Sequence, residues 1–198
     1  MSRPSADRYD GTTIALHWII AFGVVFQWLG AHVIDWFPKG PLKVDARSVH
    51  IVVGALLVVA VGYRVGWRTT QGVRMTLGLR TWRDRVASAV HVALYGLMTA
   101  ALLLGLFNSW VRGDDLFGLM HIPMFGTYDV AARHALANRV VGLHRLAANL
   151  LLGLAAAHAG AGLVHYIILR DGVLNRMLPL RPRVPRVLES NSTVLNRR

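Results

Sequence analysis

The last long apolar run of the chain, Val140 to Leu169, limits most strongly what this sequence can fold into. A helix that crosses a bilayer needs about 20 predominantly apolar residues, and this run is longer than that. Three histidines interrupt it, His144, His158 and His165. Because a histidine is rare inside hydrocarbon and usually functional when present, the run predicts a transmembrane helix that carries a functional site.

Two of these histidines share one face of the predicted helix. His144 and His158 are 14 positions apart in the sequence, which leaves them about 40° apart around the helix axis. The same spacing separates them by roughly 21 Å along the axis. Two histidines on one face, near opposite leaflets of the bilayer, suggest two stacked ligand sites.

The composition places the chain in the membrane class. Of its 198 residues, 54% are hydrophobic and only 16% are charged, a balance too apolar for an ordinary soluble domain. The formal net charge of +12 is explained by the basic cytoplasmic loops of membrane proteins, so we expect no nucleic-acid partner. The absence of cysteine excludes thiolate haem ligands, cysteine-ligated iron–sulfur clusters and covalent haem attachment.

Four apolar segments predict an all-α membrane protein, a four-transmembrane-helix bundle. The expected spans are Thr12–Phe37, Val49–Trp67, Val86–Trp110 and Val140–Leu169. They form one predicted domain over residues 12–169, between an N-terminal tail of residues 1–11 and a basic cytoplasmic tail of residues 170–198. Residues 129–141 could extend the fourth helix along the interface, and residues 181–198 are expected to be disordered.

The distribution of basic residues predicts the orientation. The N-terminal tail, the second loop and the C-terminal tail carry 14 Lys and Arg, whereas the first and third loops carry 6. Because cytoplasmic loops collect Lys and Arg, both termini are expected in the cytoplasm.

This orientation proposes two histidine pairs by depth. The second and fourth helices both run from outside to inside, so His50 and His144, in their first turns, share an outer depth. His17 lies near the inner end of the first helix, and His158 lies in the inner half of the fourth, roughly 21 Å deeper than His144. Depth therefore pairs His17 with His158 and His50 with His144.

Such pairs point to a metal-containing cofactor. Helix bundles build cofactor sites from side chains on facing helices, and two neutral imidazoles on different helices become useful to one another only through a metal. Neither pair has a carboxylate, which argues against non-haem iron or zinc, whereas haem b with two axial imidazoles fits. Nearby glycines would let a flat macrocycle approach the backbone: Gly54, Gly153, Gly160 and Gly162.

The alternative is that these histidines are hydrogen-bonding helix contacts. His91 and His165 lack a same-depth partner beyond the four already used, so they are read as structural or as proton relays. His32, His121 and His134 lie in or near the outer loops and are expected to be solvated. With both irons six-coordinate, no position is open for a gas, and two such centres would conduct single electrons across the bilayer.

Several short motifs now resemble one known family. They are LHW at Leu16–Trp18, His50 followed by Gly54 and Arg64, His91 with Tyr95 and Gly105, LHRLAAN from Leu143, His158 with His165 and Tyr166, and RDGVLNRMLP ending at Pro179. From Tyr9 to Pro179 the chain resembles the bacterial cytochrome b561 family of dihaem inner-membrane b-type cytochromes. One departure is Leu102, which stands where a proline is expected in the middle of the third helix and leaves the kink of that helix in question.

The resemblance implies functional assignments. In this family, histidines corresponding to His17, His158, His50 and His144 hold two haem b groups in the bacterial inner membrane, and electrons are exchanged with ubiquinone or ubiquinol. Superoxide is an electron donor for some members. The resemblance also suggests a haem-propionate or quinone contact for Arg64, although an arginine that snorkels to the interface would look the same in the sequence.

Two charge arguments come from the residues themselves. Arg145, beside His144, could neutralise a propionate of the outer haem through a charge-assisted hydrogen bond. The outer loops carry 6 Lys and Arg against four aspartates, Asp45, Asp114, Asp115 and Asp129. This near balance gives only weak support for steering of anionic superoxide.

Three functions remain open at this point. The first is a quinone-linked oxidoreductase, with superoxide as one candidate donor, or a pure electron carrier. The second is a haem b membrane anchor that passes electrons for a partner dehydrogenase or hydrogenase subunit. The third is a non-redox membrane protein whose histidines are structural or carry protons. Haem content separates the third from the other two.

Overall fold

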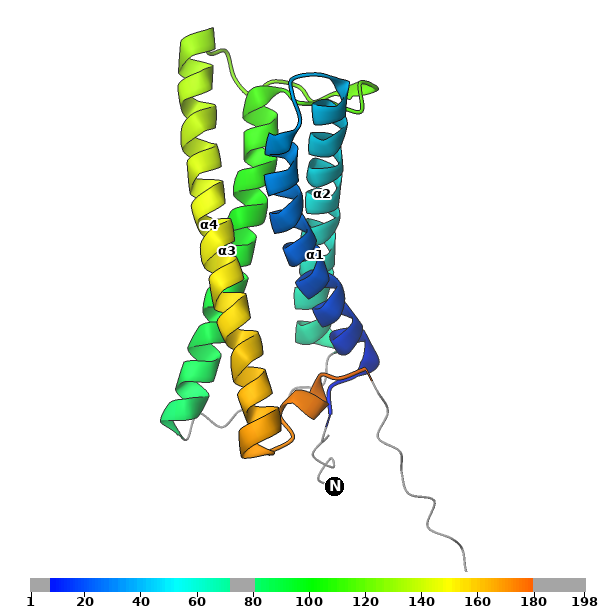
Figure 1. Cartoon of the computed structure of the whole chain (residues 1–198), viewed down its shortest axis with the longest axis vertical. Coiled ribbons are helices and arrows are strands. Elements are labelled where there is room, and N and C mark those ends of the chain that lie inside the picture. Colours follow the sequence, from blue (N-terminus) through cyan, green and yellow to red (C-terminus); the bar gives the residue numbers. More distant parts are fainter. Residues whose placement is uncertain (1–7, 72–80, 180–198) are drawn as a thin grey trace, which may run out of the picture.

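The computed structural model describes residues 8–71 and 81–179, and its main feature is a bundle of four long helices (Figure 1). All four are long and apolar enough to cross a membrane, which confirms the predicted all-α, four-helix class. The long helices are α1 (Gly11–Trp36), α2 (Pro41–Thr70), α3 (Trp82–Arg112) and α4 (Val130–Val164). The short elements are strands β1 (Asp115–Leu116) and β2 (Met120–His121), the π-helical turn η1 (His165–Leu169) and the 3-10 turn η2 (Leu174–Arg176).

The helix ends test the predicted spans. The ends of α1 differ from prediction by one residue, but α2 begins at Pro41 rather than at Val49, so the prediction of a loop up to Ser48 was wrong. Proline suits the first turn of a helix, where its missing N–H would have no partner in any case. The predicted extension of the fourth helix is helical and continuous with α4, and Asp129 caps it by accepting from the backbone N–H of Ala132.

The helices form a ring in which neighbours in sequence pack together. The closest packing is between α3 and α4 and between α1 and α2, while α2 also packs on α3 and α4 touches α1 more sparingly. This order places α2 diagonally across the bundle from α4. One buried residue from each helix forms the central apolar cluster: Ile20, Val61, Met98 and Leu151.

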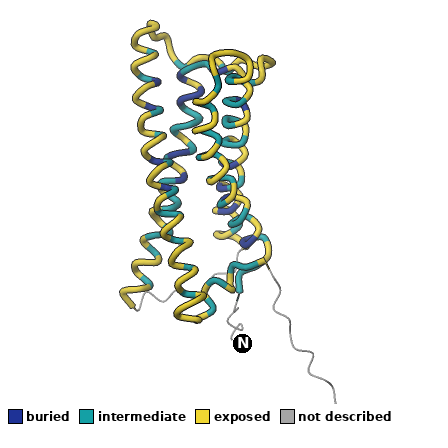
Figure 2. The backbone as a smooth tube through the Cα atoms, viewed as in Figure 1, coloured by how far each residue is buried: buried dark blue, intermediate teal, exposed yellow. Residues whose placement is uncertain are grey.

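The outward faces of the bundle are apolar. Figure 2 shows exposed residues along every long helix, with the buried residues confined to short stretches between them. Large apolar side chains on these faces are open, such as Phe22 at 67% and Leu56 at 63% exposed. Because apolar side chains are favourable against lipid tails and the backbone of a helix satisfies its own hydrogen bonds, such faces suit a bilayer.

The two ends of the bundle are distinct. The start of α1, the end of α2, the start of α3 and the end of η1 lie at one end, here called the inner end, and the opposite end is called the outer end (Figure 1). The chain therefore enters and leaves the bundle at the same end, as predicted. Residues 1–7, 72–80 and 180–198 lie outside the described residues, and so does the expected disorder of residues 181–198. That the inner end faces the cytoplasm remains a prediction from the basic loops.

The connection from α3 to α4 at the outer end is folded rather than a simple loop. The hydroxyl of Ser48, a fully buried residue of α2, lies 2.8 Å from the carbonyl of Val44 and 3.1 Å from that of Asp115, and it accepts the backbone N–H of Phe117. Arg133 donates to the carbonyls of Val111, Phe125 and Gly126. The hydrogen bonds of Ser48 fasten the β1–β2 hairpin to α2, and those of Arg133 join α4 to the end of α3 and to the segment after β2.

Candidate functional site

The outer histidine pair joins two helices that lie across the bundle from each other. His50 of α2 and His144 of α4 have ring centroids 6.2 Å apart, with their planes at 86°. The structure therefore brings together the pair expected from depth.

Helix α3 holds the ring of His144 in place. Its Nδ1 lies 2.8 Å from the carbonyl oxygen of Ala101, and because a carbonyl can only accept, this nitrogen carries the proton and leaves Nε2 free to bind a metal. At Gly105, a Cβ atom would lie 3.0 Å from Cε1 of His144, so the glycine makes room for the ring.

His50 is held through its backbone instead. Gln27 donates to the His50 carbonyl at 2.8 Å, and a Cβ at Gly54 would come within 3.1 Å of the Gln27 amide nitrogen. Gly54, expected to admit a macrocycle, thus gives room to Gln27 in this structure. The Nδ1 atom of His50 is buried and has no hydrogen-bond partner among the described residues.

The inner site contains three histidines rather than two. The ring centroids of His17 and His158 are 6.5 Å apart, with planes at 77°, as the depth argument expects. The ring of His91, in α3, also contacts His158, and the two ring centroids are 5.3 Å apart. Sequence reasoning found no unused partner for His91 and did not place it against His158.

The ring spacings show which pairs leave room for a metal ion. An imidazole nitrogen binds a metal such as zinc at about 2.0 Å, so two rings that hold one metal ion between them have centroids roughly 6 Å apart. All three histidine contacts are edge-to-face, but only the pairs at 6.2 and 6.5 Å have that spacing, and the 5.3 Å between His91 and His158 is too short for it. The two pairs, together with the buried Nδ1 of His50, which has no partner among the described residues, fit haem held between imidazoles.

A different metal arrangement finds no support in residues 8–71 and 81–179. No group of three or more His, Asp or Glu side chains gathers there in a way that could hold a metal ion.

Arg64 is buried between helices at the inner site. The residue is only 8% exposed, its Nε donates to the hydroxyl of Tyr95 at 2.9 Å, and its Nη1 donates to the carbonyl of Thr13 at 2.9 Å. A snorkelling arginine would extend its guanidinium to the interface, and this one is held inside the bundle.

Arg145 lies on the surface of α4. Its side chain is 66% exposed and approaches the carboxylate of Asp35 at 3.4 Å. The structure therefore pairs it with an aspartate of α1, and the expected role as a propionate contact gains no support from this position.

The remaining histidines lie towards the ends of the bundle. His32, His121 and His134 are exposed, as expected. His165 donates from Nδ1 to the carboxylate of Asp171 at 2.5 Å, and this hydrogen bond is the main reason why the pKa of Asp171 lies below its usual value. At the outer end, the pKa of Asp114 is shifted in the opposite direction, because burial raises it. The guanidinium groups of Arg112 and Arg47, at 3.1 and 3.4 Å, act to lower this pKa but do not outweigh the burial.

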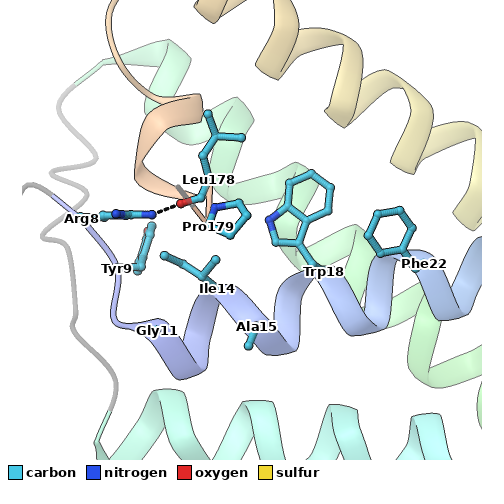
Figure 3. A pocket seen from close by; sticks show the side chains of 9 residues that line it. All are labelled: Arg8, Tyr9, Gly11, Ile14, Ala15, Trp18, Phe22, Leu178 and Pro179. Atoms are coloured by element: carbon cyan, nitrogen blue, oxygen red, sulfur yellow. Dashed lines mark hydrogen bonds between the residues drawn. The ribbon is translucent and has the colours of Figure 1, made fainter. Parts of the chain in front are cut away.

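A cavity of about 750 Å³ lies at the inner end beside α1 (Figure 3). Trp18 spans one wall, donates from Nε1 to the carbonyl of Met177 at 2.8 Å, and has its ring centroid 5.6 Å from that of His17. Arg8 closes another side by donating to the carbonyl of Leu178. The lining residues are Arg8, Tyr9, Gly11, Ile14, Ala15, Trp18, Phe22, Leu178 and Pro179.

Sequence reasoning quoted Tyr95 and Gly105 of α3 among the family motifs but gave them no role in the site. One signal was available: Tyr95 follows His91 by four positions, which puts both on one helix face, and Gly105 stood among the family motifs. Ala101 carried no signal, because its contribution is a backbone carbonyl that any residue would supply.

Comparison with known proteins gives consistent matches. The model of the family described as Prokaryotic cytochrome b561 matches residues 8–180. The chain is 29% identical over 178 residues to Cytochrome b561 homolog 1 of Escherichia coli strain K12, covering 88% of this chain and 99% of that protein. It is 25% identical over 181 residues to the Probable superoxide oxidase CybB of Yersinia pestis, with 87% and 96% covered. It is 29% identical over 180 residues to Cytochrome b562 of Cereibacter sphaeroides, with 88% and 96% covered.

Proposed function

Since the chain belongs to the prokaryotic cytochrome b561 family, we propose that it is a dihaem cytochrome that carries electrons across the membrane and exchanges them with ubiquinone or ubiquinol. Family membership and the four spans make it a multi-pass protein of the bacterial inner membrane that transfers electrons with haem b. The number of haem groups, their ligands and the quinone partner are the parts that we propose.

The observation that carries the proposal is the pair of histidine contacts at two depths of one helix. Helix α4 contributes His144 to the outer pair and His158 to the inner pair, at ring separations of 6.2 and 6.5 Å. We assign His50 and His144 as the residues that would hold a haem at the outer site, and His17 and His158 as those that would hold one at the inner site. Bound there, the haem groups would supply reversible one-electron transfer.

The chain's own residues prepare these ligands. The Ala101 carbonyl selects the His144 tautomer that keeps Nε2 unprotonated, and hydrogen bonds of this kind also raise the basicity of a ligating imidazole. At the inner site the ring of His91 against His158 restricts how that ligand can rotate. We infer that the bundle holds the four proposed ligands ready at two positions.

Superoxide is the donor we propose to test first. The support is a relative whose printed name is Probable superoxide oxidase, which aligns with 87% of this chain. The nearly balanced charge of the outer loops gives no strong electrostatic attraction for the superoxide anion, so we expect its rate to depend only modestly on ionic strength.

The first test is a haem count. Pyridine haemochrome analysis and a dithionite-reduced minus oxidised spectrum of the purified protein should give two b-type haems per chain. Protein expressed with sufficient haem and purified with almost none would overturn the proposal and return the histidines to helix packing.

The second test separates a self-standing oxidoreductase from an electron-carrying anchor. Purified protein is mixed with a short-chain ubiquinone and an enzymatic source of superoxide, and quinol formation is followed. Reduction by the purified chain alone supports the oxidoreductase. Haem that is reduced only in the presence of a co-purifying dehydrogenase or hydrogenase subunit would instead establish the anchor function.

A further inference from the structure

Arg64 connects three helices at the depth of the inner histidines. Its acceptor in α1 is the carbonyl of Thr13, one turn before His17, and its acceptor in α3 is the hydroxyl of Tyr95, one turn after His91. Since Arg64 itself belongs to α2, a single guanidinium is fixed between the turns that carry two of the three inner histidines.

Arg64 forms no ion pair with a carboxylate among the described residues. Both of its described acceptors are neutral oxygens, and no ion pair forms with it in residues 8–71 and 81–179. Asp10 lies further towards the start of α1, where its carboxylate accepts from Thr13 and from Trp67. An arginine keeps its charge in proteins, so the inner site contains a permanent, buried cation.

The outer histidine pair has no counterpart to Arg64 in the described part of the chain. Its immediate partners are the Ala101 carbonyl, the Gln27 amide and Gly105, all neutral. The cation nearest in sequence, Arg145, is 66% exposed and lies 3.4 Å from the carboxylate of Asp35, whose opposite charge offsets that of the arginine.

This asymmetry has a consequence for redox chemistry. The oxidised form of a haem carries one more positive charge than the reduced form, so a fixed cation nearby disfavours the oxidised form, and it does so more strongly where water is excluded. We propose that Arg64, held in place by Tyr95 as a positioning residue, raises the reduction potential of the inner haem above that of the outer haem. Electrons would then pass downhill from the outer to the inner site. This inference rests on the proposed function.

The experiment is a potentiometric titration of haem absorbance. The inner haem is measured alone in the His144→Ala background, which we expect to lack the outer haem, and both haems are measured in the full protein. Arg64→Gln removes the charge, Arg64→Lys keeps it at a different position, and Tyr95→Phe keeps Arg64 but removes one hydrogen bond. The matched controls are Arg68→Gln, an exposed arginine one turn along α2, and Tyr63→Phe, whose side chain is 54% exposed.

We expect the reduction potential of the inner haem to fall most in Arg64→Gln, the variant that loses the charge. At the ambient potential where the inner haem is half reduced in the parent protein, Arg64→Gln should raise its oxidised-to-reduced ratio about tenfold, which for one electron corresponds to 59 mV. Tyr95→Phe and Arg64→Lys should shift it in the same direction by less. Arg68→Gln should shift it less than Arg64→Gln does, and Tyr63→Phe should leave it unchanged.

Each outcome decides the inference. An unchanged inner potential in Arg64→Gln, or an equal shift of both haems, would overturn it. If Arg64→Gln fails to retain the inner haem, Tyr95→Phe decides, since it keeps the cation: a lowered inner potential supports the inference and an unaltered one rejects it. A parent protein without two haems would reject the proposed function. Two bound haems whose reduction potentials do not change in Arg64→Gln would reject only the inference about Arg64.

Discussion

The outer and inner histidine pairs use the same kind of residue in different surroundings. At the outer pair, neutral groups of α3 and α1 support the ligands, and the folded connection between α3 and α4 closes that end. At the inner pair, a third histidine lies against His158 and a buried arginine lies nearby. The comparison teaches that the histidines define where a cofactor can bind, whereas their neighbours set how the two sites differ.

Helix α3 is the element that differentiates the sites. It packs closely along α4 and carries no proposed ligand, yet it presents a backbone carbonyl and a glycine to His144 and an imidazole to His158. A helix of this kind would act as the outer shell of the two proposed ligands, a shell that in metalloproteins orients the ligand and tunes its basicity.

The largest expected effect comes from removing one ligand of one pair. His144→Ala or His50→Ala should remove the outer haem and leave the inner one, and His158→Ala should do the converse, because each pair joins different helices. Pyridine haemochrome counts should fall from two to one per chain. His32→Ala, which alters an exposed histidine of α1, serves as the control. Retention of both haems in His50→Ala or His144→Ala would break the proposed pairing.

A smaller change should disturb only the outer site. In Gly105→Ala, the new methyl group would stand 3.0 Å from Cε1 of His144, so the ring must move and outer haem occupancy should drop while inner occupancy holds. Gly105→Val should lower it further. Haem content and the low-temperature spectrum of each site measure this.

The control for that change lies in the same helix. At Gly96 a Cβ meets no atom within 4 Å, so Gly96→Ala should keep both haems and add up to about 1 kcal/mol of helix stability. Equal haem loss in the Gly96 and Gly105 variants would show that the effect comes from α3 as a whole and not from the contact with His144.

The folded outer connection predicts a loss of stability without loss of the inner site. Ser48→Ala removes the hydroxyl of a fully buried residue and leaves the backbone N–H of Phe117 without its acceptor, which should cost about 1–3 kcal/mol. Thermal unfolding in detergent measures the loss, and Thr70→Ala, at an exposed hydroxyl of the inner end, should change little. Equal destabilisation by both substitutions would contradict the role assigned to Ser48.

The sequence was sufficient for the parts of this picture that depend on distance along a helix. Apolar length predicted four spans, and the 14-residue spacing of His144 and His158 put them on one face at two depths, where the structure indeed brings each to a partner. Rotation of a helix about its own axis and the approach of its neighbours do not follow from such patterns. For that reason the contact of His91 with His158 and the burial of Arg64 could not be foreseen.

The start of α2 was misjudged for a different reason. The stretch from Phe37 to Ser48 contains proline, glycine and lysine, a composition typical of loops, yet Pro41 starts the helix and Ser48 is its most buried residue. Turn-forming residues also favour helix starts, and only the packing of the β1–β2 hairpin on Ser48 distinguishes the two uses.

The smallest expected effect compares the two ends through their carboxyl groups. The hydrogen bond from His165 lowers the pKa of Asp171 below 3.8, so its ionised form stabilises the folded segment at pH above 3.8, and this contribution is lost as pH falls through the lowered value. For Asp114, burial raises the pKa above 3.8, so stability falls as pH rises from 3.8 through the raised value. The free energy of unfolding in detergent should therefore be measured as a function of pH across this range. Asp171→Asn should remove its rise with pH below pH 3.8, and Asp114→Asn should remove its fall with pH above pH 3.8. Two slopes of the same sign would mean that the inner and outer carboxyl groups lie in similar surroundings.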